Sequence, residues 1–384
     1  MRGTSRERTG AGWIMALTTE QVLARLASVM SADGRIALVE TGRLSDIVIT
    51  DGRVMLSIAI EAGEAARWEP VRAAAEAAIK GLPGVLGALV SLTAERAADA
   101  TPARPGASAA ASAASAGRPE VYPNLAKVRH VIAVASGKGG VGKSTTACNL
   151  ALALTMLSGP AGRLKVGVLD ADIYGPSMPK LFALKGQPRI TSGRTLAPLE
   201  GYGCKVMSIG FLVDLSKAMI WRGPMVASAI TQMLRDVEWG ELDVLVVDMP
   251  PGTGDAQLTL AQQAPLAGAV IVSTPQDLAL IDARRGVAMF KDVDVPILGL
   301  IENMSYFVCD ECGKRHHIFA HGGAREESGR LAIPFLGEIP LELEIRERSD
   351  AGLPVVVTAP ESTAAEAYRR IAAEVWAALD NRRK

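Results

Sequence analysis

The chain has 384 residues, 49% of them hydrophobic, and its 41 basic residues balance its 41 acidic residues. This length allows a substantial core and more than one domain, and a net charge of zero gives no bulk field that favours nucleic acid or an anionic membrane. Four cysteines are too few for a disulfide-stapled secreted scaffold, and no apolar run reaches the ~18 residues of a spanning helix. We therefore expect a soluble cytoplasmic protein, with no nucleic acid and no membrane among its partners.

Residues 18–98 carry the pattern of a small α+β domain. Thr18 offers an N-cap to an amphipathic helix, and Asp51-Gly52 lies between two strand-like runs, which is a strong hairpin signal. An alanine-rich helix is expected over Glu69–Lys80, and a third strand over Ala88–Leu92. The mixture of one hairpin and two helices predicts a compact unit of its own.

The segments on either side of this domain show no pattern of a packed core. Residues 1–17 lack the apolar stretch of a signal peptide, so we expect a disordered extension. Residues 99–122 are rich in alanine, serine and proline and have almost no bulky apolar side chains, which predicts a flexible linker. The second domain then runs from 123 to 384.

In this second domain, apolar runs alternate with helical stretches. Runs of this kind are typical of parallel strands that are buried on both faces, with helices as the crossovers. The fold class predicted is α/β, a largely parallel sheet flanked by helices, and the motif GKGGVGKS within it predicts a P-loop NTPase. Ligands on such sheets bind at the carboxyl ends of the strands. The predicted strands are Val131–Ala135, Val166–Leu169, Val244–Val247, Ala269–Val272 and Ile297–Ile301.

The sequence GKGGVGKS follows the first of these strands and opens a helix, which is the context that a phosphate-binding loop requires. Its glycines let successive backbone amides point at the phosphates, and the helix adds its positive end. We expect Lys143 to reach the β- and γ-phosphates of ATP, Ser144 to bind Mg²⁺, and Thr145 to support the α-phosphate. The alternative, a glycine-rich turn that binds nothing, does not explain the full motif in this context. The predicted nucleotide-binding residues of the loop are Gly137, Lys138, Gly139, Gly140, Val141, Gly142, Lys143, Ser144 and Thr145.

Acidic residues end two of the predicted strands. Asp170 and Asp172 follow one strand, and Asp248 ends another. We assign Asp170 and Asp248 to Mg²⁺ together with Ser144, and Asp172 to the orientation of the attacking water. The alternative role, a helix cap or a turn residue, would serve for one aspartate, but it does not explain two strand ends beside a phosphate loop.

Lys138 is one lysine more than the loop needs, because Lys143 already neutralises the phosphates from within the same subunit. A cation at this position is well placed to reach the phosphates of a facing subunit, as an arginine finger does in trans. The alternative is a solvated lysine on a loop. The stretch KGGVGKS with this first lysine resembles the deviant Walker A ATPases, the class of MinD, ParA, the nitrogenase iron protein and the Mrp/ApbC proteins. This resemblance implies an ATP-sandwich dimer in which Lys138, like Lys143 and Asp172, takes part in catalysis.

Cys309 and Cys312 form a CxxC pair, which supplies half of the four ligands that zinc or an iron–sulfur cluster takes. The missing ligands come either from a second CxxC across a twofold axis or from the nearby His316, His317 and His321, which would make a zinc site. A redox dithiol is a third alternative. Spacing alone does not separate the cluster from zinc.

Three further polar or sulfur-containing residues are placed by their surroundings. Cys148 lies in the helix after the phosphate loop and Cys204 beside an apolar stretch, so we expect both to be small core residues. Asn303 follows a strand end, where it either reads the adenine edge of the nucleotide or is an ordinary turn residue.

From Pro123 to its end, the chain resembles the Mrp/ApbC iron–sulfur cluster carriers in a combination of motifs. The first hundred residues resemble the small iron–sulfur-assembly-associated domain that often precedes this ATPase, but here that domain has no cysteine. The resemblance implies a homodimer that holds a labile cluster, [4Fe–4S], between two CxxC pairs. It also implies assembly proteins as donors and ATP hydrolysis for loading or for transfer to apo-proteins. The motifs are VLDADIYGPSMP, WRGPM, DMPPGTGDAQLTL, STPQD, IENMSYF and the CxxC pair.

Two alternatives belong to other classes. A MinD- or ParA-like positioning ATPase would need a membrane- or DNA-binding surface, and the last helix, about Ser362 to Leu379, is its best candidate. The mixed charges of its polar face favour instead a helix docked on the sheet. A zinc-stabilised ATPase that acts as a scaffold is the second alternative.

Overall fold

The computed structural model describes residues 17–45, 47–50, 53–61, 64–85, 87–95, 122–159, 162–191, 195–213, 223–309 and 311–381. It divides into two compact units, one on each side of residues 96–121, and each unit is described by itself. The predicted extension 1–17 and linker 99–122 lie outside the described residues except for their last positions.

The small unit folds as the sequence predicts. Thr18 caps the first helix through a capping box, in which the Gln21 amide donates to Thr18 Oγ1 at 3.3 Å and the Thr18 amide to Gln21 Oε1 at 3.0 Å. Strand β1 pairs antiparallel with β2, Thr50 opposite Arg53, so the predicted hairpin is confirmed although its two turn residues lie outside the described residues. Strand β3 then joins β2 in parallel after a helical crossover. The elements are α1 (Thr19–Leu26), η1 (Leu38–Thr41), β1 (Val48–Thr50), β2 (Arg53–Glu61), α2 (Ala65–Lys80) and β3 (Gly87–Glu95).

The large unit is built on an eight-stranded sheet in the order β15-β12-β11-β4-β10-β7-β9-β8. Every pairing in it is parallel except the one between β8 and β9. All five predicted strands are present, and β8, β9 and β15 extend the sheet at its two edges. The strands are β4 (Val128–Ala135), β7 (Val166–Asp170), β8 (Leu199–Gly201), β9 (Cys204–Ser208), β10 (Leu242–Asp248), β11 (Leu266–Ser273), β12 (Ile297–Glu302) and β15 (Phe335–Glu338).

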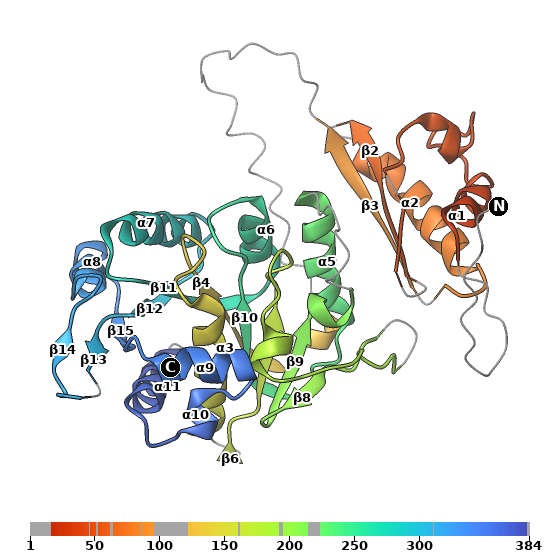
Figure 1. Cartoon of the computed structure of the whole chain (residues 1–384). Helices are drawn as coiled ribbons and strands as arrows, with labels where there is room; N and C mark the ends of the chain where they lie inside the picture. The colour runs from red at the N-terminus through yellow and green to blue at the C-terminus, as the bar shows by residue number, and fades with distance from the viewer. Residues whose placement is uncertain are drawn as a thin grey trace, which may run out of the picture. The chain divides into compact units, whose positions relative to one another are not determined.

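Helices cover both faces of this sheet (Figure 1). Helices α3, α10 and α11 pack against one another on one face, while α5, α6 and α7 follow one another across the other. The central strands are buried on both sides, which is why they are continuous runs of valine, leucine and isoleucine. The helices are α3 (Lys143–Thr155), α4 (Met178–Leu181), α5 (Gly223–Asp236), α6 (Asp255–Gln263), α7 (Asp277–Asp292), α8 (Gly323–Leu331), α9 (Leu343–Ala351), α10 (Val355–Thr358) and α11 (Thr363–Asn381). The short elements are η3 (Pro123–Leu125), η4 (Ile209–Phe211), β5 (Ser158–Gly159), β6 (Gly162–Arg163), β13 (Phe307–Val308) and β14 (Arg315–His316).

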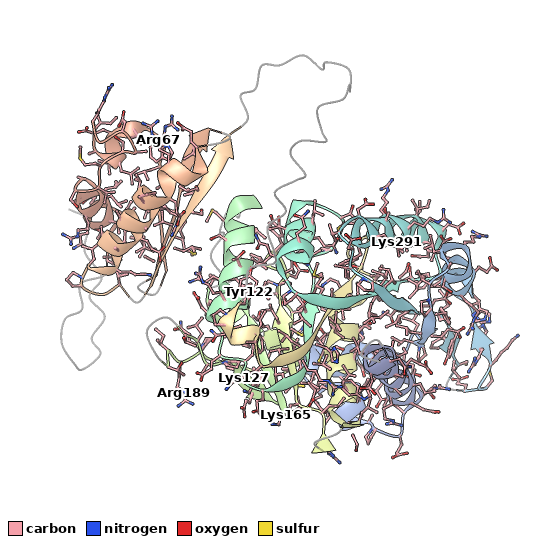
Figure 2. All side chains as sticks on the ribbon, turned by 180° about the vertical axis from the view of Figure 1, so that it is seen from behind. Arg67, Tyr122, Lys127, Lys165, Arg189 and Lys291 are labelled. Carbon is pink, nitrogen blue, oxygen red and sulfur yellow. The ribbon has the colours of Figure 1, made fainter. Side chains whose placement is uncertain are left out.

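The direction of the crossovers reverses beside β4. The chain leaves β4 through α3 toward β7 on one side, and later crosses from β10 through α6 to β11 on the other. In an open parallel sheet, ligands bind at such a switch point, outside the carboxyl ends of the strands. Lys127 and Lys165, labelled in Figure 2, directly precede β4 and β7. They mark the amino-terminal ends of the strands, opposite to the ends where ligands bind.

The last helix is docked, as predicted. Tyr368, Ile371 and Val375 of α11 are buried against α3 and the sheet. Trp376 lies edge-on to the ring of His130 and under the guanidinium of Arg129, at 6.0 and 5.2 Å. Among the described residues, no helix has the length and apolar composition needed to cross a membrane.

Candidate functional site

The phosphate loop joins β4 to α3 and depends on glycine at two close approaches. A Cβ on Gly137 would lie 2.2 Å from the backbone of Asp282 in α7, and one on Gly142 would lie 2.2 Å from Nδ2 of Asn303. Gly142 also has a φ of +80°, in the left-handed region, where it caps α3. The loop therefore holds its shape by direct backbone contact with α7 and with the residue after β12.

Lys143 is buried within a group of oxygen atoms at the start of α3. Its Nζ donates to Asp248 Oδ1 at 2.6 Å and to Ser144 Oγ at 3.2 Å, and it lies 3.7 Å from Asp172 Oδ2. These contacts bring the lysine, the predicted Mg²⁺ ligands Ser144 and Asp248, and the predicted water-orienting Asp172 to one place. Such a cation, held at the positive end of a helix, is suited to phosphate.

Asp170 is fully buried, and its carboxylate fixes the chain that follows β7. Its Oδ2 accepts hydrogen bonds from the backbone amides of Ser177 and Met178, both at 3.0 Å, and from Ser208 Oγ at 2.9 Å. Burial, and then the negative charge of Asp248, raise the pKa of Asp170 to about 7. These contacts show a positioning role that the sequence did not indicate, and the assignment of Asp170 to Mg²⁺ stays a prediction.

Asp248 has one oxygen bound and one oxygen free. Its Oδ1 accepts from Lys143, but its fully buried Oδ2 has no hydrogen-bond partner among the described residues. Burial raises the pKa of Asp248, and the positive charge of Lys143 opposes that rise. A buried carboxylate oxygen beside Ser144 that accepts no hydrogen bond is suited to bind a hard cation or a water of its shell.

Asn303 holds the phosphate loop by its side chain. Its Nδ2 donates to the carbonyl of Val141 at 2.8 Å, and its backbone amide donates to Ser273 at the end of β11. The residue is buried and lies in the turn that follows β12, and its side chain binds the loop. The predicted contact with adenine stays a prediction.

Lys138 lies at the tip of the loop and is partly exposed. Its backbone carbonyl accepts from Ser136 Oγ at 2.9 Å, but its ammonium group makes no hydrogen bond or ion pair with any described part of the chain. The role of Lys138 in a second subunit stays a prediction.

Cys309 and Cys312 lie in the turn between β13 and β14. The turn is closed by backbone hydrogen bonds from Cys309 to Lys314 at 3.0 Å and from Gly313 to Cys309 at 2.8 Å. Cys309 is half-buried and Cys312 is exposed. The CxxC pair therefore lies at the surface of the large unit, with Cys312 the more exposed of the two.

The histidines do not complete a zinc site around these cysteines. His321 lies instead with Glu302 and Glu338, and one ligand atom from each of the three falls within 4.8 Å of the others. No comparable group in the described part of the chain includes a cysteine. The local Cys₂His₂ alternative is therefore not assembled, because the chain after β14 carries His321 back to the ends of β12 and β15.

The other two cysteines are core residues, as predicted. Cys148 and Cys204 are 0% and 1% exposed. Burial raises the pKa of Cys204 to about 12 and the pKa of Cys148 well above its usual value, so both thiols stay protonated.

Three buried or paired charges escaped the sequence analysis. Glu302 is 0% exposed and accepts hydrogen bonds at the start of α8. Arg284 of α7 binds Glu327 of α8 with two hydrogen bonds, at 2.5 and 2.7 Å. The available signal for Glu302 was a carboxylate at the end of a fully apolar strand, directly before Asn303.

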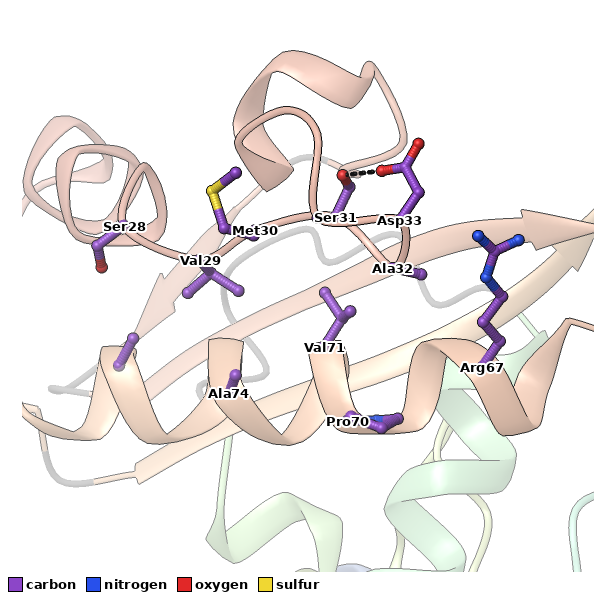
Figure 3. A pocket seen from close by; sticks show the side chains of 12 residues that line it. Ser28, Val29, Met30, Ser31, Ala32, Asp33, Arg67, Pro70, Val71 and Ala74 are labelled. Carbon is purple, nitrogen blue, oxygen red and sulfur yellow. Dashed lines mark hydrogen bonds between the residues drawn. The ribbon is translucent and has the colours of Figure 1, made fainter.

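The small unit has a hollow of about 770 Å³ between α2 and the loop after α1 (Figure 3). Met30, Val71 and Ala74 supply apolar lining, and Ser31 Oγ donates to Asp33 Oδ1 at 2.6 Å on its rim. No cysteine or histidine lines it, so it offers no soft ligand for a metal.

Comparisons with known proteins agree with this geometry. Residues 127–376 match the family described as NUBPL iron-transfer P-loop NTPase, and residues 19–92 match the family described as iron-sulfur cluster assembly protein. The mouse iron-sulfur cluster transfer protein NUBPL is 54% identical over 67% of this chain and 80% of its own length. An iron-sulfur cluster carrier protein of Escherichia coli is 50% identical over 67% of this chain and 69% of its own. A nucleotide-binding protein from Archaeoglobus fulgidus, solved with ADP, is 41% identical with a TM-score of 0.55 and covers 63% of this chain and 93% of that one. The chain belongs to the NUBPL iron-transfer P-loop NTPase family.

Proposed function

We propose that this protein is an ATP-dependent iron–sulfur cluster carrier that receives a cluster from assembly proteins and delivers it to apo-proteins. The observation that carries the proposal is the CxxC pair of Cys309 and Cys312, which lies at the surface of a P-loop NTPase. Relatives that are half identical or more are named as carriers or transfer proteins, which favours this function over a positioning ATPase.

The nucleotide in this proposal is ATP with Mg²⁺. Lys143 exchanges its carboxylate partners for the β- and γ-phosphates, which the backbone amides of the loop surround. Ser144 and the unpaired Oδ2 of Asp248 hold the metal side of the site. Bound Mg²⁺ neutralises charge that develops on the phosphate oxygens. Asp172, 3.7 Å from Lys143, orients the attacking water.

The cluster is the cargo, and one chain supplies only part of its ligands. A [4Fe–4S] cluster takes four thiolates. Cys148 and Cys204 are buried, so one chain offers only Cys309 and Cys312 to a cluster at its surface. A second copy provides the remaining two ligands through its own CxxC turn. The proposal therefore requires a homodimer.

Two features beside the phosphate loop support a second copy there. Lys138 has no partner among the described residues, and α7, which touches the loop at Gly137, exposes Leu278 by 72% and Ile281 by 41%. Apolar side chains this exposed gain free energy when a partner covers them. Lys138 of each copy then reaches the phosphates of the other, and hydrolysis accompanies closure of the dimer.

The test is anaerobic reconstitution with iron and sulfide. Cys309→Ser and Cys312→Ser should each lose the visible absorption of the cluster and most bound iron, while nucleotide binding stays unchanged. Cys204→Ser is the control, since that thiol is buried and should leave the iron content intact. Full iron content in both Cys309→Ser and Cys312→Ser would contradict the assignment.

Metal analysis of the same samples addresses the zinc scaffold. Zinc in place of iron, with no cluster after reconstitution, would favour that alternative. The proposed location is the cytoplasm, and this stays a prediction because the relatives include a mitochondrial protein of Arabidopsis thaliana.

A further inference from the structure

Two consecutive residues at the end of β12 face two different sites. Asn303 donates to the phosphate loop at Val141 and lies against Gly142. Glu302 contacts the start of α8, the helix that follows the CxxC turn. Asn303 therefore contacts the phosphate loop, and its neighbour Glu302 contacts the helix that follows the CxxC turn.

The contacts of Glu302 are short and buried. Its Oε1 accepts from Ser305 Oγ at 2.6 Å and from the Gly322 amide at 3.1 Å, and its Oε2 accepts from the Ala324 amide at 2.7 Å. A carboxylate at the amino end of a helix is favoured by the helix dipole, and burial strengthens such bonds. Glu302 thus fixes the position of α8 relative to β12.

Both ends of the CxxC hairpin leave from this neighbourhood. On its first side, Met304 has a φ of +57°, in the left-handed region, and Tyr306 accepts the Leu341 amide at 2.7 Å. On its second side, the guanidinium of Arg315 lies 4.1 Å from the centre of the Tyr306 ring. Glu302 therefore contacts the chain on both sides of the hairpin, through Ser305 before β13 and through Gly322 after β14.

A second contact route joins the same elements. The phosphate loop meets α7 where Gly137 lies against Asp282, and Arg284 on that helix holds Glu327 of α8 through two hydrogen bonds. Glu327 is 1% exposed, whereas the Arg284 side chain is 44% exposed, so water reaches the pair from the arginine side. Helix α8 is thus tied to the phosphate loop through α7 as well as through β12.

We propose that Glu302 is a positioning residue that couples the phosphate loop to the CxxC turn. Phosphates that bind the loop draw its backbone toward themselves, the shift reaches Asn303 through Val141, and Glu302 passes it to α8 and the hairpin. A nucleotide changes such an equilibrium only by its different affinity for the two arrangements, and the coupling acts in both directions. The inference rests on the proposed function because that function gives the turn a cluster to bind. The coupling itself is a property of the protein and needs no cluster.

The accessible thiols provide a readout that needs no cluster. In the metal-free reduced protein, a maleimide reaches Cys309 and Cys312, whereas Cys148 and Cys204 are buried. The rate of labelling is measured by mass spectrometry with and without Mg-ADP, which binds the loop through its phosphates. We expect Mg-ADP to change the rate at the CxxC pair by about fivefold or more.

The variant that breaks the link is Glu302→Gln, which faces the amides of α8 with a donor in place of one acceptor. We expect its labelling response to Mg-ADP to fall below about twofold, with the affinity for ADP within about threefold of the original protein. The control is Asp236→Asn. Asp236 is also buried, but it ends α5 and precedes the amino-terminal end of β10, so this variant should keep the full response. If Glu302 had only a structural role, Glu302→Gln would lower the melting temperature. It would not lose the labelling response while keeping its affinity for ADP.

The outcomes separate this inference from the proposed function. A full response in folded Glu302→Gln, or no response in the original protein, overturns the coupling even when Cys309 and Cys312 hold a cluster. Loss of the response in Glu302→Gln supports the coupling even if reconstitution shows no cluster. Should Glu302→Gln not fold, Ser305→Ala removes the hydroxyl donor to the same carboxylate and should at least halve the response. An unchanged response in Ser305→Ala overturns the proposal.

Discussion

The phosphate loop follows β4 and the CxxC turn follows β12, two strands separated by β11, and the two sites are built in opposite ways. Lys143, Asp172 and Asp248 are buried and hold one another within a single chain. Cys309 and Cys312 lie at the surface in a short hairpin, and among the described residues no group of metal-ligating side chains includes either of them. Under the proposed function, this difference means that one chain holds most of the nucleotide site but only two of the four thiolates that a [4Fe–4S] cluster takes.

The largest effect is expected from Lys143→Ala. This change removes the cation that meets the phosphates and leaves buried Asp248 without its partner, so hydrolysis should fall by roughly 10³-fold. The free energy of unfolding should fall by about 3 kcal/mol, because a buried charge loses its pair. Steady-state ATPase assays and urea denaturation measure the two quantities.

The control for that variant is Lys165→Ala, which breaks an ion pair with Glu241 in which the two side chains are 60% and 74% exposed. Water screens such a surface pair, so the free energy of unfolding should change little, and hydrolysis should not change. Equal losses in both variants would mean that the buried group has no special place in the site.

Lys138→Ala should separate ATP binding by one chain from hydrolysis that needs the second copy. ATP binding within one chain should change by less than about threefold, while hydrolysis falls by about 10³-fold, as for a finger residue supplied in trans. Binding is followed with a fluorescent ATP analogue and hydrolysis by phosphate release. Lys291→Ala, on α7, is the matched control, and a Lys138→Ala protein with normal hydrolysis would refute the role in trans.

Leu278→Asp tests whether α7 is covered by the second copy. A charge at a position that is 72% exposed in one chain should leave its folding unchanged but weaken the ATP-bound dimer by about tenfold, measured by sedimentation. Leu343→Asp places the same charge at another exposed leucine, on α9, and should leave the dimer intact. A dimer unaffected by Leu278→Asp would move the interface away from α7.

The smallest effect concerns the thiols themselves. At pH 8, a maleimide should label two of the four cysteines in the folded protein and all four in denaturant. Burial raises the pKa of Cys204 to about 12, so its thiol is protonated throughout the accessible range. Labelling of Cys148 or Cys204 at the rate of Cys312 would mean that the core opens readily.

The sequence predicted the elements whose signal is local. The central strands are continuous apolar runs, and GKGGVGKS is a motif with its own physical meaning. The edge strands β8 and β15, and β9 next to β8, escaped because they are short or contain lysine, glutamate and glycine, which lower the strand signal.

The site was predictable only as far as its residues act through their immediate neighbours. The hydrogen bonds of Glu302 to Gly322 and Ala324, and of Arg284 to Glu327, join segments that are distant in sequence, so no spacing indicates them. The same holds for His321, whose place beside Glu302 follows from the path of the chain after β14 and not from its distance to the cysteines.

The central claim is that two copies share one cluster. Native mass spectrometry under anaerobic conditions, with iron counted in the same sample, measures the mass of the form that carries iron. The account predicts one cluster per two chains, and Cys312→Ser should abolish both the cluster and the iron-bearing dimer. A single chain that carries a complete cluster and delivers it to an acceptor would contradict the account.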